Sequence, residues 1–118
     1  MIDGIINVYK EQNYTSFDVV AKLRGILKQK KIGHTGTLDP MAEGVLLVCL
    51  GKATKLVDLL TEGNKCYRAT MKLGYETDTE DVTGEKTVEG DSAVISGLTE
   101  ETICKAILSF VGKYDQIP

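Results

Sequence analysis

The sequence has one histidine, three cysteines and two prolines in 118 residues. Its cysteines, Cys49, Cys66 and Cys104, form no C-x-x-C pair and lie within or beside apolar stretches. A zinc site or a Ser-His-Asp triad therefore lacks the ligands or the spacing that it needs. We expect reduced, structural thiols in a cytoplasmic protein, with no metal site.

Long apolar runs are missing too. No stretch approaches the roughly 20 residues that span a membrane. The first ten residues, MIDGIINVYK, lack both the basic region and the long apolar region of a signal peptide. The chain has no internal repeat, low-complexity segment or linker. With 42% apolar and 26% charged residues, it is expected to form one soluble domain with a real core and no membrane partner.

Charge is unevenly distributed along the chain. Residues 1–75 carry 11 basic and 7 acidic side chains, whereas residues 76–118 carry 3 and 10. The stretch 19–38 contains no acid and five basic residues: Lys22, Arg24, Lys28, Lys30 and Lys31. This patch could contact phosphates or could be a solvated helix face, and composition alone leaves both open.

Apolar periodicity predicts an α+β (mixed α/β) domain with a largely antiparallel sheet and flanking helices. Strands are expected at Gly4–Tyr9, at Val45–Leu50 with both faces buried, at Cys66–Leu73 with one face buried and, less regularly, at Lys86–Val88. The first helix should be capped by Thr15 or Ser16 and should bury Phe17, Val20, Leu23, Ile26 and Leu27 before Lys28–Lys31 close it. Further helices are expected at Ala53–Thr61, ended by a left-handed Gly63, and from Thr99 through Phe110 to Gly112.

The segment Lys31–Gly51 is the most distinctive part of the sequence, with four glycines, the only histidine and an Asp-Pro step. Its loop, Gly33–Gly44, carries His34 and an Asp39-Pro40 step ahead of the apolar strand. Proline pushes the preceding residue toward extended backbone, so Asp39 should adopt a defined conformation. Taken alone, however, an Asp-Pro step is usually turn chemistry, and a lone histidine is usually a local hydrogen-bonding group.

An acidic stretch that includes Asp78, Glu80 and Asp81 suggests a calcium loop. Val82 and Thr83 stand where an EF-hand needs a ligand and a glycine, so a solvated acidic loop is the better interpretation.

Several motifs together resemble one family. The loop GHTGTLDPMAEGVL at residues 33–46 is followed, in order, by CLGKATK at 49–55, KCYRA at 65–69 and LGYETDTEDVTG at 73–84. These motifs resemble the catalytic segments of the bacterial tRNA pseudouridine synthase B family, whose relatives include the dyskerin-type synthases. The resemblance covers essentially the whole chain and implies the pseudouridine synthase catalytic fold.

The resemblance also implies roles for individual residues. Asp39 would be the catalytic aspartate for converting uridine 55 in the tRNA T-loop to pseudouridine, with no metal or cofactor. Base flipping would bring the uridine into the site, where Tyr67 would stack on it and His34 would fill the space that it left. Lys31 and Lys55 are weaker candidates for contacts with the RNA backbone, in the T-loop or T-stem.

The family's later motifs do not follow Pro118. Residues 1–118 are therefore expected to be the N-terminal part of a catalytic domain, without the rest of that domain or a C-terminal RNA-binding domain. We expect the longer protein to be monomeric, and the 118-residue chain to have little or no activity and to expose sheet edges that allow dimerisation. A chain that only binds RNA or assists its folding is the alternative.

Overall fold

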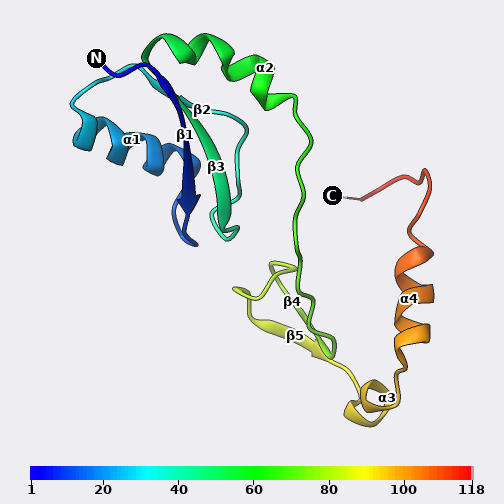
Figure 1. The fold of residues 1–118 in the computed structure, drawn as a ribbon. Coiled ribbons are helices and arrows are strands. Elements are labelled where there is room, and N and C mark those ends of the chain that lie inside the picture. Colours follow the sequence, from blue (N-terminus) through cyan, green and yellow to red (C-terminus); the bar gives the residue numbers. More distant parts are fainter. Residues whose placement is uncertain (118) are drawn as a thin grey trace. The chain divides into compact units, whose positions relative to one another are not determined.

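A computed structural model describes residues 1–117, and the chain divides into two compact units, Met1–Tyr67 and Arg68–Pro118. The elements of each unit can be followed in Figure 1. Both units combine helices with an antiparallel sheet, so the predicted α+β class is confirmed. That residues 1–118 together form part of one catalytic domain stays a prediction.

The first unit is built on a three-stranded sheet. Strands β1 (Gly4–Lys10) and β2 (Ile32–His34) both pair antiparallel with β3 (Gly44–Leu50), in the order β1-β3-β2. The predicted strand Val45–Leu50 is therefore the centre of the sheet, which explains its continuous apolar run. Val45, at its start, is nevertheless exposed.

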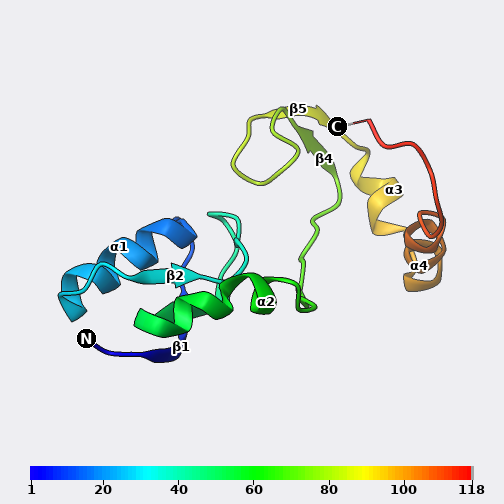
Figure 2. The same cartoon turned by 90° about the horizontal axis from the view of Figure 1, so that it is seen from above.

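Helices lie on both sides of this sheet (Figure 2). Helix α1 (Ser16–Leu27) contributes Val19 and Val20 to a buried cluster with the alternate β3 residues, which are Leu46, Val48 and Leu50. The 3-10 helix η1 (Gly51–Leu56) and helix α2 (Val57–Thr61) follow β3, and the Val57 side chain packs beside Gly33 of β2. Because side chains alternate along a strand, both faces of β3 are needed for packing.

Helix α1 begins as predicted, with Thr15 at the N-cap. Its hydroxyl accepts from the Asp18 N–H at 3.0 Å, while the Asp18 carboxylate accepts from the Thr15 N–H at 2.9 Å, which completes a capping box. The predicted buried stripe is partly wrong, because Phe17 and Ile26 are 62% and 65% exposed. The buried face is instead centred on Val19 and Val20, which join the core cluster.

Of the local predictions after β3, one is confirmed in part and two are wrong. Residues 53–61 are helical, but the first turns are the 3-10 helix and only Val57–Thr61 is α-helical. Gly63 is not left-handed, because α2 ends at Glu62 in ordinary right-handed backbone. The predicted strand Cys66–Leu73 is irregular and exposed, since its alternating apolar residues find no partner strand among residues 1–117.

The second unit has a short hairpin and two helices. Strand β4 (Tyr75–Thr77) pairs antiparallel with β5 (Lys86–Glu89), which confirms the short predicted strand there. Helix α3 (Ser92–Ser96) was not predicted, because only five residues form it and no apolar repeat marks it.

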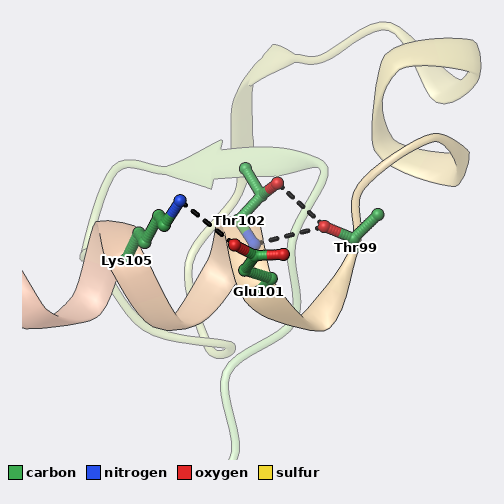
Figure 3. Close-up of polar contacts among 4 residues, drawn as sticks. All are labelled: Thr99, Glu101, Thr102 and Lys105. Carbon is green, nitrogen blue, oxygen red and sulfur yellow. Dashed lines mark hydrogen bonds and ion pairs between the residues drawn. The ribbon is translucent and has the colours of Figure 1, made fainter.

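Helix α4 (Glu100–Leu108) is capped by Thr99 as predicted. The Thr99 hydroxyl accepts from the Thr102 N–H at 3.2 Å, and Lys105 pairs with Glu101 at 3.1 Å (Figure 3). The helix ends at Leu108, short of Gly112, and its predicted apolar face is largely exposed, with Ile107 at 53% and Phe110 at 68%.

The cysteines differ in their surroundings. Cys49 is fully buried in β3, and burial raises the pKa of its thiol, so it fits the predicted structural role. Cys66, on the irregular segment after α2, and Cys104, on α4, are both exposed. None of the helices described between residues 1 and 117 is long and apolar enough to cross a membrane.

Candidate active-site loop

The loop that carries Asp39 joins β2, at one edge of the sheet, to the central strand β3. Its first residue, Thr35, is bound to β3 twice, because its N–H and its hydroxyl donate to the Leu47 carbonyl oxygen at 2.9 and 3.1 Å. The Leu38 side chain is buried in the core cluster below α1. The Leu38 backbone N–H donates to the Ser16 hydroxyl at 3.0 Å, which links the loop to the first turn of α1.

The middle of the loop is bound from the other side of the sheet. The Gly36 N–H donates to the Thr61 hydroxyl at the end of α2, at 3.2 Å. The Lys65 ammonium lies 3.5 Å from the Thr37 carbonyl oxygen. Gly36 has φ +64°, a left-handed conformation that glycine adopts without strain.

The end of the loop is held by a buried lysine. Lys10, the last residue of β1, is fully buried, and its ammonium donates to the carbonyl oxygens of Glu11, Tyr14 and Pro40 at 3.0, 2.7 and 3.4 Å. The Asn13 N–H also donates to the Pro40 oxygen, at 2.7 Å. Because a buried ammonium must be hydrogen-bonded, Lys10 ties the Pro40 peptide to the β1–α1 connection.

Asp39 lies between these two anchored neighbours and is exposed. Its carbonyl oxygen accepts from the Ala42 N–H at 2.9 Å, which closes a tight turn after it. Within residues 1–117 its carboxylate accepts no hydrogen bond and forms no ion pair. The fold therefore presents the Asp39 carboxylate to solvent on a fixed backbone, as a nucleophile or a charge-stabilising group requires.

His34 is the last residue of β2, although the sequence placed it in the loop. It pairs with Val48 of β3 and is partly buried. Its ring Nδ1 lies 2.9 Å from the Gly36 carbonyl oxygen. Since a carbonyl oxygen only accepts, this bond places a proton on Nδ1.

No hydrogen bond within the described residues orients Tyr67 toward Asp39. Tyr67 is 57% exposed on the irregular segment that follows α2. The strand that was predicted to orient Tyr67 is absent, so no regular element fixes its exposed side chain.

Lys31 and Lys55 are both exposed. The Lys31 carbonyl oxygen accepts from the Gly51 N–H at 2.8 Å, which joins the start of β2 to the start of η1, and Lys55 lies within η1. Two cations of the basic stretch also have contacts within the unit. The Arg24 guanidinium donates to the Ile32 carbonyl oxygen at 3.4 Å, and the Lys22 ammonium lies 5.5 Å from the centre of the Tyr14 ring.

Acidic groups gather at the far end of the loop. Hydrogen bonding to Glu43 and the negative charges of Glu43 and Glu11 raise the pKa of the exposed Tyr9 hydroxyl. The end of the loop at Glu43 is therefore more acidic than the end that follows Lys31.

Sequence reasoning missed the role of four side chains that hold the loop from outside, which are Lys10, Ser16, Thr61 and Lys65. Lys10 simply ends an apolar strand, and no pattern shows that its ammonium is buried. Lys65 lies in a stretch already noted for its resemblance to a family, which was the one available signal.

A glycine-bearing loop displays the exposed Asp39 and Glu43 carboxylates after a strand-end histidine, with exposed lysines on neighbouring elements. These features define the class: an α+β protein with a candidate carboxylate nucleophile. The sequence model of the TruB family pseudouridylate synthases (N terminal domain) matches residues 24–118. The chain belongs to that family, which confirms the resemblance drawn from its motifs.

Curated relatives agree with this assignment. The tRNA pseudouridine synthase B of Clostridium perfringens (strain 13 / Type A) is 54% identical over 117 residues, which are 99% of this chain and 39% of the relative. That of Lactococcus lactis subsp. cremoris (strain MG1363) is 50% identical over 117 residues, 99% of this chain and 35% of the relative. The chain thus spans well under half the length of these relatives.

Among solved structures, similar chains occur in an H/ACA RNP bound to a substrate RNA containing 2′-deoxyuridine and in a Cbf5-Nop10-Gar1 complex. Each is 51% identical, with TM-scores of 0.47 and 0.45. They cover 48% and 47% of this chain, and 18% and 17% of theirs.

Proposed function

We propose that the protein carrying this chain converts uridine to pseudouridine in tRNA, at position 55 of the T-loop, and that residues 1–118 form the N-terminal part of its catalytic domain. One observation carries the proposal: the family match over residues 24–118 includes the whole Asp39 loop. The curated relatives that are named tRNA pseudouridine synthase B support tRNA as the substrate.

Asp39 is proposed as the catalytic carboxylate. In the reaction the N1–C1′ bond breaks, the uracil rotates and a C5–C1′ bond forms, while C5 loses a proton and N1 gains one. Uridine and pseudouridine are isomers, so the overall reaction consumes no oxidant or reductant. A carboxylate can attack the sugar or the base, or stabilise a cationic sugar, and the exposed Asp39 side chain on its anchored backbone suits each of these roles.

His34 and Tyr67 are proposed to handle the flipped base. A uridine inside a folded T-loop must leave its stack to reach Asp39. The exposed ring of Tyr67 offers a stacking surface, and His34, oriented by the Gly36 carbonyl group, is proposed to fill the space that the base leaves.

Lys31 and Lys55 are proposed to contact backbone phosphates. Both ammonium groups are exposed in the same unit as Asp39. Such contacts would set the register of the RNA and would carry no sequence information.

Release of tritium from C5-labelled uridine in a T-loop RNA tests the proposal, in the full gene product. Asp39→Asn should abolish release while leaving RNA binding in place. Asp58→Asn, which removes another exposed carboxylate of the same unit, is the matched control and should keep activity. Normal turnover by Asp39→Asn would refute the assignment.

Binding of RNA without catalysis is the second candidate, favoured by the exposed lysines of residues 19–38. A gel-shift titration against the T-loop hairpin, at several salt concentrations, separates the two. Salt-sensitive binding by a full gene product that releases no tritium would support this alternative.

A further inference from the structure

We propose that Thr61 and Lys65 are positioning residues of the Asp39 loop, binding opposite ends of the Gly36–Thr37 dipeptide. They would hold the loop and also tie it to the segment that carries Tyr67. The catalytic part of this inference rests on the proposed function, whereas the structural part does not.

Thr61 binds the first end of the dipeptide. Its hydroxyl donates to the Val57 carbonyl oxygen within α2 at 2.7 Å, which fixes the direction of its proton. The oxygen lone pairs then face away from that bond, and one accepts from the Gly36 N–H at 3.2 Å. The last turn of α2 thus presents an oriented acceptor to the loop.

Lys65 binds the second end. Its ammonium donates to the Thr37 carbonyl oxygen at 3.5 Å and lies over the Cα atom of Gly36. A Cβ atom at position 36 would stand 2.5 Å from the Lys65 Nζ and 2.8 Å from its Cε. The lysine can therefore occupy this place because residue 36 has no side chain.

The dipeptide lies between the two groups proposed for the chemistry. The Gly36 carbonyl oxygen accepts from the His34 ring at 2.9 Å, and Thr37 is followed by the buried Leu38 and then by Asp39. Between the anchors at Thr35 and Leu38, the backbone of this dipeptide is bonded to Thr61 and Lys65 as well as to His34. Loss of the bonds to Thr61 and Lys65 would free the Gly36 carbonyl group, and with it the His34 ring.

Lys65 also fixes where the following segment begins. Tyr67 comes two residues later, a reach of about 7 Å for an extended chain. Residues 64–67 have no helix or strand to hold them. The contact of Lys65 with Thr37 therefore keeps the start of the Tyr67 segment at the Asp39 loop before any RNA is bound.

Amide hydrogen exchange in the 118-residue chain tests the structural part. Thr61→Val removes the acceptor at nearly constant volume and should speed exchange of the Gly36 N–H by about fivefold, as expected for one lost hydrogen bond. Thr61→Ser keeps the hydroxyl and should restore the wild-type rate. Lys65→Met should speed exchange at Leu38 or Gly36, whereas Lys52→Met, at another exposed lysine, should not.

Kinetics in the full gene product test the catalytic part. Thr61→Val and Lys65→Met should each lower kcat by about fivefold with KM nearly unchanged, and Thr61→Ser should rescue the first.

If both variants keep wild-type exchange and kcat, the proposal is wrong. If Lys65→Met instead weakens RNA binding with a reduced salt slope, Lys65 is a phosphate contact and its positioning role is refuted. A wild-type protein without synthase activity would refute the proposed function, while the exchange rates would still decide whether the two residues hold the loop.

Discussion

The ammonium group of Lys10 lies 3.4 Å from the carbonyl oxygen of Pro40, so a buried cation at the end of β1 is bonded to the residue that follows Asp39. The same ammonium also binds the carbonyl oxygens of Glu11 and Tyr14. One side chain therefore satisfies three backbone acceptors where the β1–α1 connection meets the loop.

Lys10→Met should destabilise the first unit, because it keeps most of the side-chain volume but removes the ammonium donor from the Glu11 and Tyr14 carbonyl groups, while Pro40 keeps only its bond from Asn13. A loss of about 2 kcal/mol in the free energy of unfolding is expected, typical of a buried group left unsatisfied. Urea unfolding followed by circular dichroism measures it. Lys30→Met, at an exposed lysine, should change stability by less than about 0.5 kcal/mol, and equal stability of the two variants would contradict the bonding described.

Gly36→Ala should also destabilise the protein, for a different reason. At φ +64° an L side chain is strained by about 1–2 kcal/mol, and the new methyl group would displace the Lys65 ammonium. Gly25→Ala is the matched control, because this helical glycine has open space around it. It should stabilise α1 by roughly 0.5–1 kcal/mol, so opposite signs are expected from the same denaturation experiment.

The capping box of α1 should make stability depend on pH. Bonds from the Thr15 backbone N–H and then from its hydroxyl lower the pKa of Asp18 below its usual 3.8. The folded state thus favours the carboxylate, and this contribution is present above pH 3.8 and is lost as the pH falls through the depressed folded value. Asp18→Asn should be less stable than the wild type near pH 6, and the difference should narrow below pH 4. A difference that stays constant across this range would show that charge is not involved.

Lys55→Gln should weaken binding of the T-loop hairpin in a salt-dependent way. One lost phosphate contact lowers the slope of log K against log salt concentration by about 0.7–0.9. Lys113→Gln, which removes an exposed lysine of the second unit, serves as the control and should leave the slope unchanged. Filter binding at four or five salt concentrations measures both, and identical slopes for wild type and Lys55→Gln would remove Lys55 from the interface.

The sequence predicted those helices and strands whose caps or apolar runs lie within a few residues of one another. The strand around Val48 and the cap at Thr99 were predicted correctly, and the cap of α1 was narrowed to Thr15 or Ser16, because caps and apolar runs depend on residues close together in the sequence. The predicted stripe of α1 failed at Phe17 and Ile26, since burial depends on the elements that pack against a helix and not on its own periodicity alone.

Long-range packing explains the remaining errors. Tyr67 was placed on a strand because its neighbours alternate, but a strand needs a partner and residues 66–73 have none in the described part of the chain. At the site, the sequence indicated which residues to examine, whereas the burial of Lys10 and the contact of Lys65 with Thr37 depend on the fold. The roles of Asp39, His34 and Tyr67 in the reaction stay predictions.

The irregular segment after α2 has a practical consequence. Residues 64–73 are exposed and without helix or strand, and they contain Lys65, Arg68 and Lys72, where trypsin cleaves. An RNA that covered Tyr67 would shield the neighbouring peptide bonds. The rate at which trypsin cuts there would then report how much of the protein is occupied by RNA, without a labelled substrate.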